Sequence, residues 1–299
     1  MGPTGAAIDP PPVTLGIAGL GYAGAMMIRA AARHPGIRLL AGADPRPEPR
    51  AAFARDFGAA THADIDALCA DPAIEAIYIA TPHQFHAEHV LRAAAAGKHV
   101  IVEKPLALTL ADCDRIIAAV ERAGVTLITG HTHAFDPTIR AMRRLIAGGT
   151  LGRLGMIATW NYTDFLYRPR RPEELDTARG GGILFNQVPH QLDIIRLLGG
   201  GRLKSLRAQA AVLDPARPTE GSCTAFLEFE DGAAASLVYS GYDHFDSDEL
   251  HFGVSEAGAP KPHARPGATR RALAAPAAPE SERRAHRAYG AATLAAEQP

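Results

Sequence analysis

The stretch GIAGLGYAG, residues 16–24, decides the fold, because an apolar run ends in it and a helical pattern begins directly after it. Its glycines follow the spacing G-x-G-x-x-G at Gly19, Gly21 and Gly24. In such a turn the first glycine permits a tight bend, the second lets a pyrophosphate approach the backbone, and the third lets the helix pack against the strand. The N–H groups at the helix start then face the phosphates. The alternative is a glycine-rich turn without a ligand.

Asp44 closes the next apolar run, twenty residues after Gly24. A carboxylate at this distance accepts hydrogen bonds from the ribose hydroxyls of NAD. Arg46 lies two residues further on and could instead hold the 2′-phosphate of NADP. The sequence therefore predicts a dinucleotide cofactor, NAD first and NADP as the alternative, with Tyr22 counted among the cofactor-binding residues of the turn.

Up to about residue 133, predicted strands alternate with predicted helices. Such alternation indicates right-handed βαβ units and a parallel sheet covered on both faces. We therefore expect a doubly wound (Rossmann) domain over residues 13–133, preceded by a disordered segment over residues 1–12. The predicted strands are 13–18, 37–43, 74–80, 98–102 and 125–129, and the predicted helices are 22–34, 47–57, 83–96 and 110–123.

A second, α+β domain is expected over residues 134–257, because strand-like stretches there follow one another without crossover helices. Such a succession favours a mostly antiparallel open sheet. Residues 258–299 are rich in Pro, Ala and Arg, and we expect them to be poorly ordered, with a helical piece near 280–288 and the domain truncated. The strand-like stretches are 154–164, 203–212, 222–229, 233–240 and 249–254, and a helix is expected over 184–198.

Composition narrows the function classes. The 299-residue chain has a formal net charge of −1, which gives no argument for a nucleic-acid or membrane partner. Its three cysteines are far apart, which suits a reducing cytoplasm. Histidines cluster at 83–89 and at 131–133, but no cysteine or close carboxylate completes a ligand set, so we expect no metal.

The chemistry is expected at the ends of two predicted elements. Glu103-Lys104-Pro105 closes the strand HVIVEKP, and ligands of a doubly wound sheet bind off such strand ends. A lysine there can hydrogen-bond a substrate hydroxyl and exchange a proton with it. A lysine pointing into solvent is the alternative interpretation.

Three stretches together resemble the glucose–fructose oxidoreductase/inositol dehydrogenase (Gfo/Idh/MocA) family: GIAGLGYAG, IATPHQFHAEHVLRAAAAGKHVIVEKPLAL and GGGILFNQVPHQLDIIRLLG. The resemblance covers residues 13–253. It implies an NAD(P)-dependent oxidoreductase in which Lys104 is catalytic and His190 acts beside it. It also implies an open sheet that makes homo-oligomers. Thr81, Pro82, His86 and Glu103 are the further cofactor-binding residues that it implies, and Lys104 is counted among them as well as among the catalytic residues.

One position departs from that family, which carries Asp four residues before the histidine, where this chain has Asn186. Residues at this spacing share one face of a helix, so Asn186 is kept as a catalytic-site residue. An amide can hydrogen-bond a hydroxyl but cannot take a proton. Proton transfer then depends on His190 or Lys104, and Asp at position 186 should be tolerated. Pro189 predicts that the helix starts or kinks near Asn186.

The stretch DFLYRPRRPEELDT, residues 164–177, strengthens the resemblance to one branch, the phthalate 4,5-dihydrodiol (4,5-dihydroxyphthalate) dehydrogenases. This implies oxidation of a cyclic cis-diol to a catechol. Arg168, Arg170 and Arg171 are candidate carboxylate clamps, since a guanidinium meets a carboxylate with two parallel hydrogen bonds. His133 is a further candidate substrate residue. A solvated basic loop is the alternative interpretation of the arginines.

We expect a dehydrogenase that acts on a secondary alcohol or cyclic cis-diol, a small-molecule substrate. Three alternatives remain open: a sugar or inositol dehydrogenase of the same family, an NAD-dependent glycosidase, and a non-catalytic sensor that keeps cofactor binding. The presence of Lys104 argues against the sensor, whereas Asn186 in place of Asp is consistent with a sensor.

Overall fold

The computed structural model describes residues 11–255, 258–261, 265–275 and 278–291. The chain divides into two compact units. The first unit comprises the residues up to 130 together with those from 285 onward, and the second comprises residues 131–284. Residues 1–10 of the segment predicted to be disordered lie outside the described residues.

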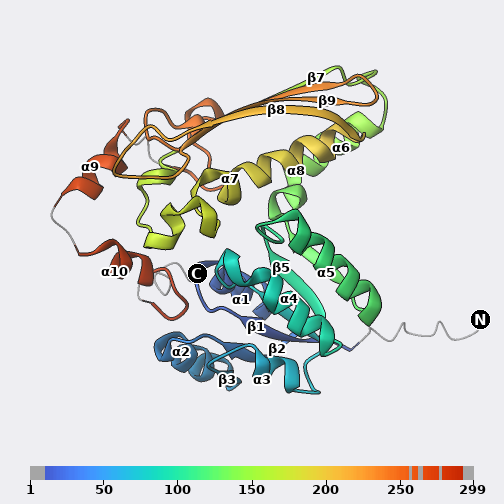
Figure 1. The fold of residues 1–299 in the computed structure, drawn as a ribbon, viewed down its shortest axis with the longest axis vertical. Helices are drawn as coiled ribbons and strands as arrows, with labels where there is room; N and C mark the ends of the chain where they lie inside the picture. Colours follow the sequence, from blue (N-terminus) through green and yellow to red (C-terminus); the bar gives the residue numbers. More distant parts are fainter. Residues whose placement is uncertain (1–10, 256–257, 262–264, 276–277, 292–299) are drawn as a thin grey trace, which may run out of the picture. The chain divides into compact units, whose positions relative to one another are not determined.

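The first unit contains one parallel sheet with the strand order β3-β2-β1-β4-β5-β6 (Figure 1). The chain starts in the middle of the sheet and builds outward in both directions, which is the doubly wound arrangement. The strands are β1 (Val13–Ala18), β2 (Ile37–Ala43), β3 (Ala60–His62), β4 (Ala76–Ile79), β5 (His99–Glu103) and β6 (Leu127–Gly130).

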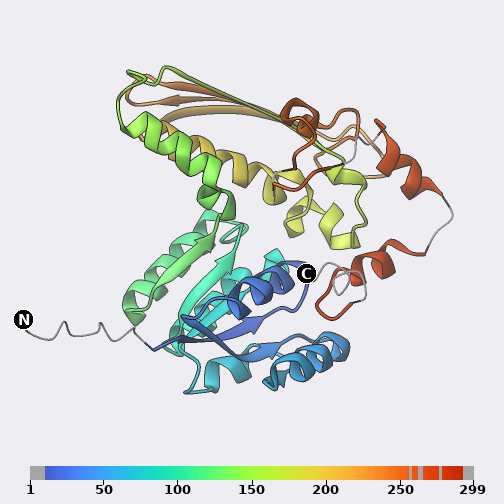
Figure 2. The same cartoon turned by 180° about the vertical axis from the view of Figure 1, so that it is seen from behind.

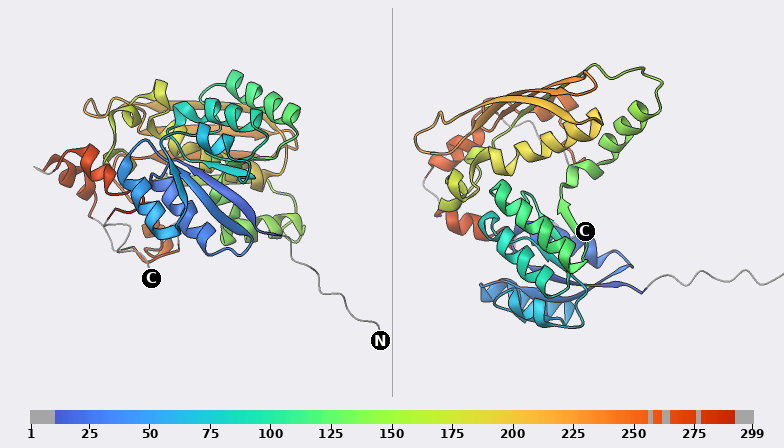
Figure 3. Two further views of the ribbon diagram at one scale, coloured as in Figure 1. Left: turned by 90° about the horizontal axis from the view of Figure 1, so that it is seen from below. Right: turned by 45° about the vertical axis from the view of Figure 1, so that its right-hand side comes forward.

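Helices cover both faces of this sheet, as the left view of Figure 3 shows. Ile28 of α1 and Phe53 of α2 are buried in one hydrophobic cluster, and Val90 of α4 and Ile116 of α5 in another. Strands enclosed on both sides are apolar along their whole length, which explains their uninterrupted apolar runs. The helices are α1 (Tyr22–Ala32), α2 (Pro47–Phe57), α3 (Asp66–Ala70), α4 (His86–Ala95) and α5 (Leu110–Ala123).

The second unit is built on a four-stranded sheet with the order β7-β10-β9-β8. Only the pairing of β7 with β10 is parallel, so the sheet is mostly antiparallel. One face packs on α8 (Val188–Gly199), whose Ile195 and Leu198 join the core residues of the strands (Figures 1 and 2). The strands are β7 (Met156–Tyr162), β8 (Leu203–Ala211), β9 (Ser222–Phe229) and β10 (Ala234–Ser240), and α6 (Pro137–Ala147) precedes them. The predicted α/β class with its two sheets is confirmed.

Local structure differs from the sequence expectation at several positions. Residues Ser247–His251 form a 3₁₀ helix, where a strand over 249–254 was expected. The side chain of Asp246 accepts a hydrogen bond from the N–H of Asp248, and this local bond competes with a strand ladder. The helix expected over 184–198 is two helices, α7 (Gly182–Asn186) and α8, separated at Gln187.

The C-terminal part contains two short helices, α9 (Ala268–Ala274) and α10 (Glu280–Ala285), inside the segment predicted to be poorly ordered. The helical piece expected near 280–288 corresponds to α10. Among the described residues, no helix combines the length and the apolar character needed to cross a membrane.

Candidate active site

The glycine-rich turn of the first unit has the geometry that its spacing predicts. Gly19 has φ +96°, and a Cβ there would lie 2.6 Å from the carbonyl oxygen of Ala80. A Cβ on Gly24 would lie 2.0 Å from the carbonyl oxygen of Gly19. A Cβ on Gly21, in contrast, would meet no described atom within 4 Å. The first and third glycines are thus required by close backbone packing, and the second leaves open space at the start of α1, the position at which turns of this kind approach a pyrophosphate.

Asp44 follows β2 and is 4% exposed. Its carboxylate accepts hydrogen bonds from the backbone N–H of Leu20 (2.9 Å) and, through both oxygens, from the guanidinium of Arg46 (2.9 and 2.8 Å). Burial alone would raise the pKa of Asp44, but the hydrogen bonds and charge of Arg46, with the N–H of Leu20, hold that pKa below its usual value. The carboxylate of Asp44 is therefore ionised and anchored to the turn, and both of its oxygens are engaged by the guanidinium of Arg46.

His86 connects the loops that follow β4 and β5. Its side chain is 0% exposed, and its Nε2 and Nδ1 lie 2.8 Å from the carbonyl oxygen of Thr81 and 2.7 Å from that of Pro105. Burial lowers the pKa of His86, although both carbonyls and Glu103 act in the opposite direction. His86 was expected among the cofactor-binding residues. In this structure its ring is buried, and it holds the backbone at Thr81, just before Pro82, and at Pro105, just after Lys104.

Glu103 ends β5 and Lys104 follows it, at the same edge of the sheet as the glycine-rich turn. The hydroxyl of Tyr78 on β4 donates a hydrogen bond to Oε1 of Glu103. Burial, and then the carboxylate of Glu103, raise the pKa of Tyr78, so its hydroxyl stays protonated as a donor. The carboxyl ends of β1, β4 and β5 are adjacent in the sheet. The first unit thus gathers Gly19, Thr81, Glu103 and Lys104 along one edge, where an α/β sheet binds its ligand.

In the second unit the structure brings His190 and His133 together. Their rings meet edge to face, with centroids 4.5 Å apart. His133 lies in the 3₁₀ helix Thr132–Phe135, and its Nδ1 is 2.8 Å from Oδ2 of Asp136. His190 lies in the first turn of α8, just after Pro189. Two predicted site residues from distant stretches of sequence therefore form one pair.

Asn186 ends α7, and its side-chain amide forms hydrogen bonds with backbone carbonyl groups. Its Nδ2 donates hydrogen bonds to the carbonyl oxygen of Gly182 (2.8 Å) and to that of Gly180 (3.3 Å). A carboxylate has no N–H to donate, so Asp cannot reproduce these contacts. The departure from the family pattern is thus matched by a local backbone arrangement that uses the amide.

The three predicted carboxylate clamps each pair with acidic residues of their own loop. Arg168 donates from Nε to Asp164 (2.8 Å), and the Nε of Arg171 lies 3.3 Å from Glu174. Arg170 is 9% exposed, with its guanidinium 3.7 Å from the centre of the Phe165 ring. Burial lowers the pKa of Arg170 to about 9.

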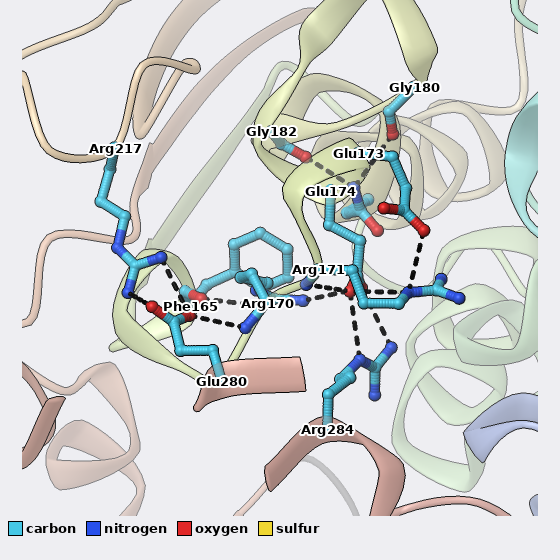
Figure 4. Close-up of polar contacts among 11 residues, drawn as sticks. Phe165, Arg170, Arg171, Glu173, Glu174, Gly180, Gly182, Arg217, Glu280 and Arg284 are labelled. Atoms are coloured by element: carbon cyan, nitrogen blue, oxygen red, sulfur yellow. Dashed lines mark hydrogen bonds and ion pairs between the residues drawn. The ribbon is translucent and has the colours of Figure 1, made fainter. Parts of the chain in front are cut away.

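Glu174 is the centre of this cluster, and part of it comes from the C-terminal helix (Figure 4). Arg284 of α10 donates to Glu174 (3.0 and 3.2 Å), and Glu280 of α10 pairs with Arg217 (2.8 and 3.0 Å). Burial opposes the charge of Glu174, but Arg284 and its neighbours lower the pKa of this carboxyl to about 2. The spacing of Arg170 and Glu174 signals a local pair, whereas nothing in the sequence indicates the partners from α10.

No group of three potential metal-ligating side chains occurs among the described residues.

Comparison with known proteins agrees with this geometry. Residues 13–131 match the oxidoreductase family with an NAD-binding Rossmann fold (GFO_IDH_MocA), and residues 139–256 match the GFO/IDH/MocA C-terminal domain. The chain belongs to the GFO/IDH/MocA oxidoreductase family, and its first unit is the NAD-binding domain of that family.

Two similar curated proteins are both dehydrogenases of hydroxylated rings. A 1-carboxy-3-chloro-3,4-dihydroxycyclohexa-1,5-diene dehydrogenase of Comamonas testosteroni is 48% identical over 252 residues, 84% of this chain and 64% of the relative. An inositol 2-dehydrogenase of Rhizobium meliloti is 33% identical, over 67% of this chain and 59% of the relative. The chain thus spans less than two thirds of the length of these curated relatives.

Solved structures show the same fold. A protein of Bordetella bronchiseptica RB50 described as a dehydrogenase is 46% identical, with a TM-score of 0.91 over 96% of this chain and 76% of that chain. A levoglucosan dehydrogenase in complex with NADH and levoglucosan is 26% identical, with a TM-score of 0.72 over 78% of this chain and 68% of that chain.

Proposed function

We propose that this chain is an NAD-dependent dehydrogenase that oxidises a carboxylated cyclic cis-diol. The observation that carries the proposal is the shared carboxyl edge of the first sheet, where the glycine-rich turn follows β1 and Lys104 follows β5, with β4 between these two strands. The similarity to a dehydrogenase of a carboxylated dihydroxycyclohexadiene supports the substrate class. The similarity to an inositol 2-dehydrogenase and to a levoglucosan dehydrogenase supplies the alternative substrate class, an inositol or a sugar.

In such a reaction the bound NAD⁺ would accept the hydride. The proton of the reacting hydroxyl passes to the amine of Lys104 or the imidazole of His190, and the carbinol carbon becomes a ring ketone. The proton on the neighbouring carbinol carbon then moves to the ketone oxygen, and this tautomerisation gives the catechol. His133, held by Asp136, positions the ring of His190. Asn186 maintains the backbone before α8 rather than taking a proton.

Recognition of the substrate carboxylate is proposed for Arg168 and Arg171. Their side chains are 35% and 40% exposed, so each guanidinium can bind a substrate carboxylate while it keeps its present acidic partner. Arg170 is buried against Phe165 and stabilises the loop instead. His86 has a supporting role beneath the cofactor loops, because its ring is buried between two carbonyl groups.

The experiment that tests the proposal compares initial rates of NADH formation at 340 nm. A carboxylated cis-dihydrodiol, the same diol without its carboxylate, and myo-inositol are offered in turn with NAD⁺. We expect the carboxylated diol to have the highest kcat/KM. The loss of one charge-assisted contact should lower apparent affinity for the uncharged diol about ten- to a hundredfold. Equal kcat/KM for the three substrates contradicts the proposed substrate class.

We also propose that the face of the second sheet turned away from α8 joins copies of this chain. Trp160 and Phe226 on that face are 64% and 52% exposed, and Val238 lies beside Trp160. Exposed apolar surface of this kind marks interaction sites. Light scattering should give a multiple of the 31.6 kDa chain for the wild type and the single-chain mass for Trp160→Glu; a monomeric wild type excludes this role.

A further inference from the structure

The segment at residues 286–291, predicted to be poorly ordered, is anchored in the first unit by Tyr289. The N–H of Tyr289 donates to the carbonyl oxygen of Leu20 (3.0 Å), and its hydroxyl donates to Asp56 (2.9 Å). Its ring packs against Phe53 and Phe57, with centroids 6.0 and 6.2 Å away, and the residue is 8% exposed. A buried ring and two directional hydrogen bonds fix this segment on the first unit.

The next residue fits the surface closely. Gly290 has φ +78°, and a Cβ there would lie 2.2 Å from the Cβ of Ala52 on α2. Only glycine takes this conformation at this distance without displacing α2. Ala288, on the other side of Tyr289, is 6% exposed. The segment is therefore held at successive positions.

This attachment places a cation at the glycine-rich turn. The guanidinium of Arg287 lies 4.2 Å from the centre of the Tyr22 ring. Tyr22 is the first residue of α1, and Leu20 and Tyr22 flank Gly21. Arg287 and Tyr289 thus contact the two neighbours of Gly21, the glycine at which an added Cβ would meet no described atom within 4 Å. The positive charge is held where the N-terminus of α1 already favours an anion.

Arg287 also differs from the other arginines around it. Arg46 forms a fork with Asp44, and Arg55 pairs with Asp56. Among the described residues, Arg287 contacts an aromatic face and has no carboxylate partner. A guanidinium over an aromatic ring keeps its N–H donors at its rim, where they can form paired hydrogen bonds with phosphate oxygens.

We propose that Arg287 binds the pyrophosphate of the dinucleotide cofactor, and that the C-terminal segment 286–291 is part of the cofactor site. The proposal rests on cofactor binding by the first unit, which the proposed function also requires. Backbone N–H groups of the turn supply neutral donors, and Arg287 adds the compensating charge. Tyr289 and Gly290 are positioning residues that hold Arg287 in place.

The test is a set of binding titrations without substrate. NADH fluorescence gives the Kd of the cofactor, and competition gives the affinities of ADP-ribose, which has the pyrophosphate, and adenosine, which lacks it. For Arg287→Gln we expect the affinities for NADH and ADP-ribose to fall about ten- to a hundredfold, with adenosine unchanged. The remaining affinity should depend less on salt than in the wild type.

Two further variants separate charge from folding. Arg115→Gln is the control. Arg115 is an exposed arginine on α5, a helix that packs in a different hydrophobic cluster from Tyr289, so this variant should leave all three affinities unchanged. Tyr289→Ala releases the anchor and should weaken ADP-ribose binding as Arg287→Gln does. Wild-type affinity for NADH in Arg287→Gln overturns the proposal. An equal loss for adenosine and ADP-ribose also overturns it, because that pattern indicates a structural role.

These titrations are independent of the substrate. If Arg287→Gln loses NADH affinity while the wild type oxidises no carboxylated diol, only the proposed substrate is contradicted. A wild type that binds no nicotinamide dinucleotide contradicts both the proposed function and the role of Arg287.

Discussion

Replacement of Asn186 by Asp is the perturbation for which the structure and the family pattern make opposite predictions. The family pattern favours Asp at this position. In the structure, however, the amide donates to the carbonyl oxygens of Gly180 and Gly182. Asn186→Asp replaces both donors by acceptors and places a carboxylate against two carbonyl oxygens.

The size of the effect follows from these contacts. Each lost hydrogen bond costs about 0.5–1.5 kcal/mol, and polar groups left facing one another add about 1–3 kcal/mol. We therefore expect Asn186→Asp to lower the free energy of unfolding of the second unit by about 2–6 kcal/mol. Urea unfolding followed by tryptophan fluorescence measures this directly, because Trp160 on β7 is the only tryptophan of the chain.

The deficit should depend on pH in a defined direction. The two carbonyl oxygens raise the pKa of the introduced carboxyl in the folded state above its unfolded value, because only the protonated carboxyl can donate. The loss of stability is then complete above the folded-state pKa and becomes smaller as the pH falls through it. Gln187→Glu introduces the same charge change one residue later, at the start of α8, where a negative charge is favourable, and it should not destabilise. Wild-type stability of Asn186→Asp at pH 8 would refute this reasoning.

Three other predictions concern separate groups. Lys104→Ala and His190→Ala should each lower turnover about a hundredfold while the NADH affinity stays nearly constant, and steady-state kinetics with a fluorescence titration check both values. Arg46→Ala should release the carboxylate of Asp44 and raise the ratio of NADH to NADPH affinity about tenfold, measured by titration with both cofactors; an unchanged ratio contradicts the role of Arg46. The pKa of Glu174 is about 2 in the folded state and 4.5 ordinarily, so its pairing stabilises the second unit above pH 4.5 and is lost as the pH falls toward 2. Glu174→Gln should remove about 2–4 kcal/mol of stability at pH 7 and flatten the acid dependence of urea unfolding, whereas an unchanged acid transition contradicts this assignment.

The features that sequence predicted well are those that depend on local geometry. The turn at residues 16–24 and the strand end at Lys104 are recognisable because glycine spacing and apolar runs reflect backbone constraints that act within a few residues. β3 (Ala60–His62) and α3 (Asp66–Ala70) were missed, since three and five residues are too few to show a period. The break at Gln187 was expected near Asn186 because proline restricts the residues around it.

The features that sequence did not predict depend on contacts between distant residues. The sequence suggested carboxylate clamps at Arg168, Arg170 and Arg171, with a solvated basic loop as the alternative. In the structure Asp164 and Glu174 pair with arginines of this loop at helical spacing, which was visible in the sequence. The salt bridge of Arg284 with Glu174 spans 110 residues and has no local signal. The same holds for Arg287 on Tyr22, because Pro, Ala and Arg content describes a segment without showing what it contacts.

Transfer of a hydride from a carboxylated cis-diol to NAD⁺ is the central claim, and deuterium labelling measures it most directly. A carboxylated cis-dihydrodiol carrying deuterium at its carbinol carbons is incubated with the wild type and NAD⁺, and proton NMR examines C4 of the NADH produced. The account predicts one deuterium at C4 and formation of the catechol, with both signals strongly reduced in Lys104→Ala. NADH without deuterium, or no NADH from this diol when myo-inositol is oxidised under the same conditions, would contradict it.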